Sequence, residues 1–528
     1  MPIETLKRTM PMASAILLPG LLFLLLGVSC TGGKASSDLA GNDRTKGSGD
    51  SGPGQKKDAG PVWPEHLKDF LLKGRAAYQI VNLFELPSFE SPRLGYLVKG
   101  TVVNVGDPDF KTADCPEGWL ELEQGGYSCR GRGLEADKGA PPRLNFIPHA
   151  PDIDASVPYN YGKVISDLTP IYKKIPSPDH VWRIPQPESP IDGGLSQDAG
   201  AGPKTLLTTR EALLDAGIDP DKNAKRHGVL RLVDRGYWLS LDSKDRDFGT
   251  TYYRTIKGGF IEASKVTAIK TTKTKCAGVA LDPARDDLTA ALVFHKKGGL
   301  LYKTNPDGTR VIGVISRPPR LSAFSVFREK VLIGKRTFYR PSTLSQRLLL
   351  DSGLQVVEIQ PLPKETAPGD KWIHVDLSKQ VVTAYEGTRP VYAALVSTGK
   401  GKEGLETPSG DYRIQSKHVT KDMEGEAMLD LEEDAYLIED VPYVQFIELS
   451  VALHGAFWHG AFGRPRSHGC INLAPEDARW LFRWTRPTLP TGWHGVFSTP
   501  SSPGTLVRIT GKTEPLKSVP NKEKAAPP

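Results

Sequence analysis

The sequence predicts a mainly β protein that is divided into several domains. The chain has 528 residues, which exceeds one ordinary domain because domains usually hold about 100 to 200 residues. Short apolar runs alternate with turn residues through most of it, as is typical of strands. Only one helix beyond these runs is predictable, near the C-terminal end. The expected architecture is therefore a set of small β modules followed by a larger β domain.

The charge balance excludes one class of partner. The chain carries 68 basic and 61 acidic residues, a formal net charge of +7, without a long basic stripe or interleaved aromatic residues. This pattern argues against nucleic acid as a partner. A mildly basic exterior favours contact with anionic polymers or membrane surfaces.

The N-terminus predicts export. Lys7 and Arg8 precede an apolar stretch at 13–28, too short for a spanning helix and without a basic stop-transfer cluster behind it, so residues 1–30 are expected to be a signal peptide. The run from Leu26 to Cys30 resembles a bacterial lipoprotein cleavage site, which implies lipidation of Cys30. Ordinary cleavage near Ser29 is the alternative.

The residue after that cysteine bears on location. Thr31, rather than an aspartate, follows Cys30, and in Gram-negative lipoproteins this resembles the pattern that permits sorting to the outer membrane. The expected location is the cell envelope, on the periplasmic face, with a lipid anchor in the outer membrane. Residues 31–65 contain mostly Gly, Ser, Asp and Lys and are expected to be a disordered linker.

A first β module is expected at residues 66–185. Cys115 and Cys129 are candidates for a disulfide in an oxidising compartment, because turn residues lie between them. The segments 118–122 and 126–129 resemble the end of a bacterial SH3-like barrel, in which a tryptophan strand pairs with a Gly-Tyr-x-Cys strand.

The middle of the chain predicts a linker and a second module. Residues 186–203 are rich in Pro, Gly, Ser and Asp, which indicates a linker. The β-rich segment 204–365 follows. Within it, Gly258-Gly259-Phe260 echoes Gly125-Gly126-Tyr127, which suggests a second SH3-like unit.

The last domain is expected at residues 370–510, with a disordered tail at 511–528. Apolar residues alternate with polar ones over 373–377, which indicates a strand of a hairpin. The predictable helix begins at Pro475, with acidic residues in its first turn and an apolar face, and ends before Pro487.

A cysteine in a polar turn is the candidate nucleophile. Cys470 lies in the run Ser467-His468-Gly469-Cys470-Ile471-Asn472. A thiolate attacks carbonyl carbon, but a free thiol with a pKa near about 8.5 is mostly protonated at neutral pH. A neighbouring imidazole is therefore needed.

Two histidines could serve Cys470. His468 is two residues away, which in an extended segment puts its side chain about 6 to 7 Å along the strand. His454 can approach from a separate segment, as bases of acyl-transfer enzymes usually do. We therefore predict His454 as the base and His468 as a supporting group.

These residues belong to a longer pattern that resembles the L,D-transpeptidase (YkuD) family. The pattern runs through Leu453-His454-Gly455-Ala456-Phe457-Trp458-His459, Phe462-Gly463-Arg464-Pro465 and Ser467-His468-Gly469-Cys470-Ile471-Asn472-Leu473. Upstream, Ser397-Thr398-Gly399 and Thr407-Pro408-Ser409-Gly410 are also similar. The resemblance covers about 371–510 and implies a β-sandwich-like catalytic domain with a short helix after the cysteine motif.

The resemblance also implies the site and the reaction. Cys470 would attack the carbonyl before the terminal D-alanine of a peptidoglycan stem tetrapeptide, and Gly469 and Cys470 would offer backbone N–H groups to the oxyanion. The acyl group would pass to a stem amine or to a lysine of a wall-attached protein. Gly455 stands where some members have serine, so only a main-chain role in orienting His454 is expected. The expected substrate-binding residues are Trp458, Asn472, Ser467 and Tyr443, and no cofactor or metal is implied.

Other readings stay open at this point. Water as the acceptor would make an L,D-carboxypeptidase. His454, His459, His468 and Cys470 could in principle bind zinc, although their spacing fits no familiar zinc pattern. Cell-wall cysteine endopeptidases place cysteine before histidine, the opposite of the order here. A non-catalytic wall-binding lipoprotein is the remaining alternative.

Overall fold

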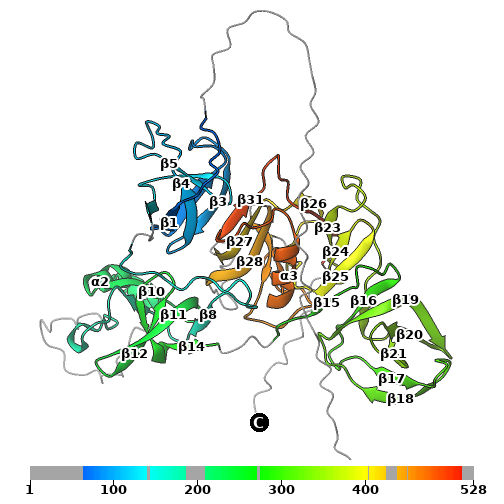
Figure 1. The fold of residues 1–528 in the computed structure, drawn as a ribbon. Helices are drawn as coiled ribbons and strands as arrows, with labels where there is room; N and C mark the ends of the chain where they lie inside the picture. The colour runs from blue at the N-terminus through cyan, green and yellow to red at the C-terminus, as the bar shows by residue number, and fades with distance from the viewer. Residues whose placement is uncertain are drawn as a thin grey trace, which may run out of the picture.

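The computed structural model describes residues 63–138, 143–185, 209–269, 274–401, 404–423, 437–448 and 450–513 (Figure 1). The predicted signal peptide, Cys30, nearly all of the 31–65 linker, the 186–203 linker and most of the C-terminal tail lie outside these residues. The fold is mainly β, as expected. In the described part of the chain, no helix is long and apolar enough to cross a membrane.

The first module has seven strands in the order β3-β2-β6-β5-β4-β1-β7. Cys115 and Cys129 form a disulfide with their Cα atoms 5.8 Å apart, beside the buried rings of Trp119 and Tyr127. The strands are β1 (Leu72–Ala76), β2 (Ile80–Phe84), β3 (Arg93–Val98), β4 (Val102–Gly106), β5 (Trp119–Leu122), β6 (Tyr127–Cys129) and β7 (Leu134–Lys138).

The second module also has seven strands, in the order β14-β8-β11-β12-β13-β9-β10. Its strands are β8 (Asn160–Val164), β9 (Thr169–Tyr172), β10 (Val229–Val233), β11 (Trp238–Asp247), β12 (Thr250–Thr255), β13 (Phe260–Glu262) and β14 (Val266–Ala268). Helices α1 (Arg210–Asp215) and α2 (Pro220–Arg226) lie between β9 and β10. Thr209 and Asp219 cap these helices, because each side chain accepts a backbone N–H of the first turn.

The domain boundary predicted at 186–203 is wrong. Strands β8 and β9 precede that stretch, yet β8 pairs with β11 and β14, and β9 pairs with β10 and β13. A polar, turn-rich composition is shared by interdomain linkers and by loops between strands, so composition alone could not separate the two cases. Residues 160–268 thus form one unit.

The first two modules share one topology. Each pairing of the first module has its counterpart in the second when β1 to β7 are matched in order with β8 to β14. In this correspondence β6 is equivalent to β13. The similar sequences Gly125-Gly126-Tyr127 and Gly258-Gly259-Phe260 therefore lead into equivalent strands. The chain therefore contains a structural repeat.

In the remainder of the predicted 204–365 module, β15 (Gly278–Ala280) joins the C-terminal domain and residues 288–356 form a third module. Its seven-stranded sheet has the order β18-β17-β21-β20-β19-β16-β22. The strands are β16 (Leu288–Val293), β17 (Leu301–Thr304), β18 (Val311–Ser316), β19 (Ala323–Ile333), β20 (Arg336–Pro341), β21 (Arg347–Leu350) and β22 (Leu354–Val356).

The C-terminal domain consists of two facing sheets. One has the order β15-β25-β24-β23-β32-β26, with β15 (Gly278–Ala280), β23 (Lys371–Asp376), β24 (Val381–Glu386), β25 (Arg389–Leu395), β26 (Gly410–Arg413) and β32 (Leu506–Thr510). In the other, the pairings give β31-β27-β28-β29-β30, with β27 (Ser416–Met423), β28 (Ile438–Glu448), β29 (Val451–Gly455), β30 (Ile471–Leu473) and β31 (Gly495–Phe497). Apolar residues from both sheets share one core.

The predicted helix is present as α3 (Pro475–Trp484). Pro475 occupies the first turn, and the backbone becomes extended at Thr485. Ala478, Leu481 and Phe482 are buried against the sheets. The helix follows β30 directly and therefore fixes the segment that carries the cysteine motif.

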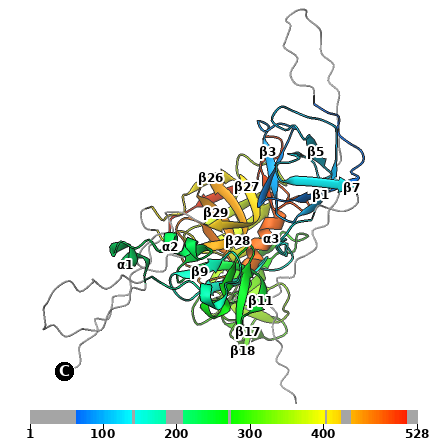
Figure 2. The same cartoon turned by 90° about the vertical axis from the view of Figure 1, so that its left-hand side faces the viewer.

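Both repeated modules dock on the second sheet of the C-terminal domain. Strand β3 of the first module pairs with β31, and β11 of the second pairs with β28 at Trp238 and Ile438. In Figure 1 the first module lies to the upper left of this domain and the second to the lower left, and Figure 2 likewise shows the two modules apart. Each module thus reaches a different part of the same sheet.

Candidate active site

One pocket of the C-terminal domain gathers most of the residues predicted from the sequence. Its lining comes from the ends of β27 and β28, from β29 and from the cysteine motif. The residues are Met423, Ile438, His454, Trp458, His459, Arg466, Ser467, His468, Cys470 and Asn472. All predicted substrate-binding residues except Tyr443 are among them.

The turn that carries the cysteine is held by two hydroxyl groups. Thr407 Oγ1 accepts the Gly399 N–H at 2.9 Å and donates to the Gly469 carbonyl at 2.7 Å. Ser467 Oγ donates to the Cys470 carbonyl and lies 3.3 Å from the Gly469 nitrogen, whose N–H it accepts. Gly469 has φ 125°, a conformation that favours glycine. The turn is therefore rigid before any substrate arrives.

Cys470 is the free cysteine of the described residues and is partly buried. Its Sγ lies 3.6 Å from the Ser450 carbonyl oxygen. Burial raises the pKa of the thiol, because it disfavours the charged thiolate. The resting group is therefore a thiol rather than a preformed thiolate.

His454 lies on β29 and lines the same pocket as Cys470. Its Nδ1 is 3.2 Å from the Gly455 carbonyl oxygen, which can only accept, so Nδ1 carries the proton and Nε2 holds the lone pair. The contact is the main-chain interaction expected at Gly455. Burial lowers the pKa of His454 to about 4, so the imidazole is neutral at pH 7.

Strand pairing brings the histidine and the cysteine to one face. β29 runs parallel to β30, with His454 opposite Asn472. Cys470 lies in the bend directly before β30, two residues from Asn472. His454, Asn472 and Cys470 all line the same pocket.

Asn472 is paired with a histidine that the sequence suggested only as a zinc ligand. The Ala461 N–H donates to His459 Nδ1 at 3.1 Å, so His459 carries its proton on Nε2, which lies 3.1 Å from the Asn472 amide. The amide orientation that satisfies both groups turns Oδ1 toward His459, since Oδ1 otherwise has no partner. Burial, and then the charge of Arg466, lowers the pKa of His459 to about 3.

Tyr443 is not brought to the pocket. Its side chain is only 1% exposed and packs against Phe482 of α3. Its hydroxyl donates to the carbonyls of Ala155 and Ile153, the second at 3.3 Å. Tyr443 therefore ties the segment between the first two modules to the core. Its position in the sequence, near the motif, gave no sign that the side chain points away from the pocket.

The other predicted roles have partial geometric support. Trp458 stacks on His454, with ring centroids 5.8 Å apart and planes at 21°. His468 lines the pocket. The Gly469 N–H is directed at Ser467 within the turn, so its role toward an oxyanion stays a prediction.

The histidines are arranged for hydrogen bonding rather than for metal binding. Nδ1 of His454 and both ring nitrogens of His459 are engaged with protein groups. Among the described residues, no group of three His, Cys, Asp or Glu side chains is placed to hold a metal ion.

A residue of the third module supports the pocket from outside the domain. Arg320 donates to the carbonyls of Gly460, Ala461 and Phe462, the first two at 3.2 and 3.4 Å. These residues follow His459 directly. Sequence reasoning missed Arg320 because the module that carries it has no recognisable motif.

One part of the chain matches a known protein family. Residues 370–509 match the YkuD family, the L,D-transpeptidase catalytic domain. The YkuD domain thus coincides with the two facing sheets apart from β15. The match covers this part of the chain and leaves the three modules unassigned, and no curated protein matches the chain.

Three solved structures with similarity to part of this chain are described as L,D-transpeptidases. The catalytic domain of the E. faecium enzyme is 23% identical and covers 27% of this chain and 98% of its own, with a TM-score of 0.20. An enzyme from Stackebrandtia nassauensis is 23% identical over 30% of this chain and 60% of its own (TM-score 0.20). L,D-transpeptidase 3 from Mycobacterium tuberculosis is 19% identical over 33% of this chain and 71% of its own (TM-score 0.22).

Proposed function

We propose that this protein is a peptidoglycan L,D-transpeptidase with Cys470 as its nucleophile. The observation that carries the proposal is one pocket holding Cys470, His454 with Nε2 unprotonated, and Asn472, within the part of the chain that matches the YkuD family. A thiol that shares a pocket with a neutral imidazole suits acyl transfer through a thioester.

The two pKa shifts determine how the nucleophile is activated. The pKa of Cys470 is raised and that of His454 is lowered, both by burial. A thiolate–imidazolium pair is therefore disfavoured before substrate binds. His454 Nε2 takes the thiol proton as Cys470 attacks the carbonyl of the donor stem, in a general-base step.

The acyl-enzyme then partitions between acceptors. The attack expels D-alanine, which takes the proton from His454 as it leaves. An amine of a second stem, or a lysine of a wall-attached protein, attacks the thioester and His454 accepts its proton. The C–S bond then breaks, and His454 returns the proton to the Cys470 sulfur. Transfer to water instead is carboxypeptidase activity. Backbone N–H groups at Gly469 and Cys470 would stabilise the oxyanion by a few kcal/mol, about 2.7 to 4 for one donor in a comparable site.

We propose in addition that the protein is anchored in the cell envelope and that its first two modules are SH3-like. A signal peptide, lipidation at Cys30 and an outer-membrane anchor would hold the enzyme at the periplasmic face, where stem peptides are found. The first two modules are proposed to be SH3-like, as the Trp119 and Gly-Tyr-x-Cys strands suggested.

Intact-protein mass spectrometry with a carbapenem tests the proposal. The wild-type protein is expected to gain the mass of one carbapenem, because the β-lactam carbonyl acylates the catalytic thiol, and Cys470→Ala is expected to gain none. Tyr443→Phe, which removes a hydroxyl outside the pocket, should acylate like wild type. Wild-type protein that forms no adduct and does not turn over tetrapeptide muropeptides would favour a non-catalytic wall-binding lipoprotein.

A further inference from the structure

A chain of aromatic rings connects the second module to His454. Trp458, which stacks on His454, receives the ring of Phe457 edge-on, at 5.0 Å between centroids and 89° between planes. Phe457 is 5% exposed. Its other contacts are Tyr161 at 4.0 Å and Trp238 at 5.5 Å, which lie on β8 and β11. Trp458, which stacks on His454, is thus supported by Phe457, and Phe457 in turn contacts two rings of the second module.

These residues form one apolar cluster that includes the nucleophile. Tyr161, Trp238, Ile438 and Phe457 are buried together, and Trp458, Met423 and Cys470 pack at its edge. Four of these residues, Met423, Ile438, Trp458 and Cys470, also line the pocket. Protein interiors are close-packed, so a displaced ring is felt by its neighbours. The second module therefore fills space directly behind the pocket wall.

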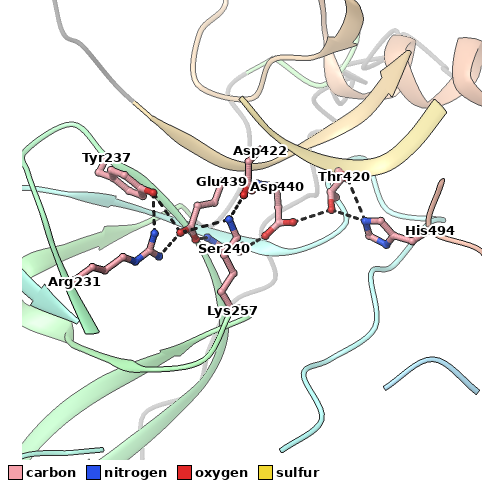
Figure 3. Close-up of polar contacts among 9 residues, drawn as sticks. All are labelled: Arg231, Tyr237, Ser240, Lys257, Thr420, Asp422, Glu439, Asp440 and His494. Carbon is pink, nitrogen blue, oxygen red and sulfur yellow. Dashed lines mark hydrogen bonds and ion pairs between the residues drawn. The ribbon is translucent and has the colours of Figure 1, made fainter. Parts of the chain in front are cut away.

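Charged groups of the second module hold the strands that flank the pocket. Met423 and Ile438 are adjacent in sequence to Asp422 and Glu439. Lys257 pairs with both carboxylates, at 3.8 Å from Glu439. Figure 3 shows Lys257 reaching these acidic residues from the module side, with Arg231 on the opposite side of Glu439.

Asp440 extends this contact. Its carboxylate accepts from Ser240 of the second module and from Thr420 at 2.9 Å (Figure 3), and its carbonyl accepts the Tyr161 hydroxyl at 2.5 Å. Backbone pairing adds the Trp238 N–H, which donates to the Leu437 carbonyl at 2.9 Å. Side chains and main chain of the second module thus fix both strands where they enter the pocket.

We propose that the second module is a structural part of the active site, and that Tyr161 and Trp238 are positioning residues that act on His454 through Phe457 and Trp458. The proposal rests on the function proposed above and adds residues outside the family-matched segment. A catalytic domain separated from this module would keep Cys470 and His454. It would lose the contacts that support Phe457 and Trp458 from the side of the module.

Paired substitutions of two interface tyrosines test the proposal. Tyr161 and Tyr96 are both buried, and each hydroxyl binds the C-terminal domain, Tyr161 at the Asp440 carbonyl and Tyr96 at His418 Nδ1, 2.9 Å away. Only Tyr161 contacts Phe457. Tyr161→Leu and Tyr96→Leu in the full chain therefore remove similar interface contacts and differ in their connection to His454.

The first readout is the pH dependence of Cys470 alkylation by iodoacetamide, followed by intact mass, with Cys470→Ser as the blank. Tyr161→Leu is expected to slow alkylation at neutral pH by roughly tenfold or more, because a misplaced base costs up to about 100-fold, and to shift the acid limb of the profile. Tyr96→Leu should keep the wild-type profile within about twofold. Equal effects of the two variants on the profile would overturn the proposal.

The second readout is the rate of carbapenem acylation, which should follow the same order. If wild type alkylates normally and forms no carbapenem adduct, the transpeptidase proposal fails while the alkylation comparison still decides the positioning role. If Tyr161→Leu does not fold, Trp238→Phe replaces it, since the smaller ring leaves a gap against Phe457. A wild-type profile for folded Trp238→Phe would then overturn the proposal, and a slowed one supports it.

Discussion

The first and second modules have the same strand topology and occupy different roles. Both add strands to the sheet of the YkuD domain, the first at β31 and the second at β28. The first meets this domain through Tyr96, His418 and Trp493, away from the pocket. The second meets it through Trp238, which lies in one apolar cluster with Phe457. Cys470 packs at the edge of that cluster. Topology alone therefore does not determine what a repeated module contributes, because the docking position does.

Two buried aromatic residues give the largest expected contrast. Phe457→Ala and Trp493→Ala each remove a ring that is 5% exposed, and each should lower the free energy of unfolding by about 3 to 5 kcal/mol. Only Phe457→Ala should also slow carbapenem acylation, because Trp493 belongs to the core of the first module. Chemical denaturation and acylation rates measure the two effects. Slowed acylation in folded Trp493→Ala would break the distinction.

A glycine at the first interface tests close approach of two backbones. A Cβ at Gly95 would lie 2.2 Å from the Gly495 carbonyl oxygen and 2.5 Å from the Trp493 ring. Gly95→Ala should therefore weaken the docking of the first module by about 1 to 3 kcal/mol, the usual cost of overpacking, and leave acylation unchanged. Gly125→Ala is a useful control, since nothing lies within 4 Å of its Cβ position although its φ is 91°. Limited proteolysis reports undocking, and equal proteolysis of Gly95→Ala and wild type would contradict the packing argument.

The charged contact of the second module predicts a smaller effect. Lys257 and Asp422 are each about one-third exposed, so solvent screens their attraction and Lys257→Met should cost only about 1 kcal/mol. Acylation should still fall, because Asp422 precedes the pocket residue Met423. Lys257→Arg keeps the charge and should restore most of the rate. Equal rates for the Met and Arg variants would mean that the charge has no part in shaping the pocket.

The two interfaces should respond oppositely to pH. Burial lowers the pKa of His418, which bonds Tyr96 of the first module, from 6.5 to about 3, so the first interface loses stability as pH falls below about 6.5 toward 3. Burial, and then Asp422, raises the pKa of Asp440 from 3.8 to about 6, so its contribution to the second interface is lost as pH rises through about 6. Hydrogen exchange of β3 and β11 at pH 4.5 and 7.5 measures both. Protection that changes in the same direction in both strands would contradict this assignment.

The sequence could predict the family-matched domain and its helix α3 because their signals are local. Cys470, His454 and their neighbours lie within twenty residues, and Pro475 marks the start of α3. The contact between His454 and the Gly455 carbonyl is likewise between neighbours along the chain. Such signals survive without knowledge of the fold.

Contacts between distant segments could not be predicted in this way. The pairing of β9 with β10 crosses a stretch that resembles a linker, and β15 joins the YkuD domain from far upstream. Tyr443 lies in a strand next to the pocket, and only the packing of α3 shows that its ring points away. Arg320 and Tyr161 support the pocket from modules without a motif, so no local pattern could reveal them.

Product analysis on purified tetrapeptide muropeptides tests the central claim most directly. Incubation with the wild-type protein, followed by liquid chromatography and mass spectrometry, is expected to release D-alanine and to yield a product in which the donor stem is joined to an amine. Cys470→Ala is expected to do neither, because the thioester cannot form. Cross-linked product formed equally by Cys470→Ala, or no D-alanine released by wild type, would contradict the assignment of Cys470 as the transpeptidase nucleophile.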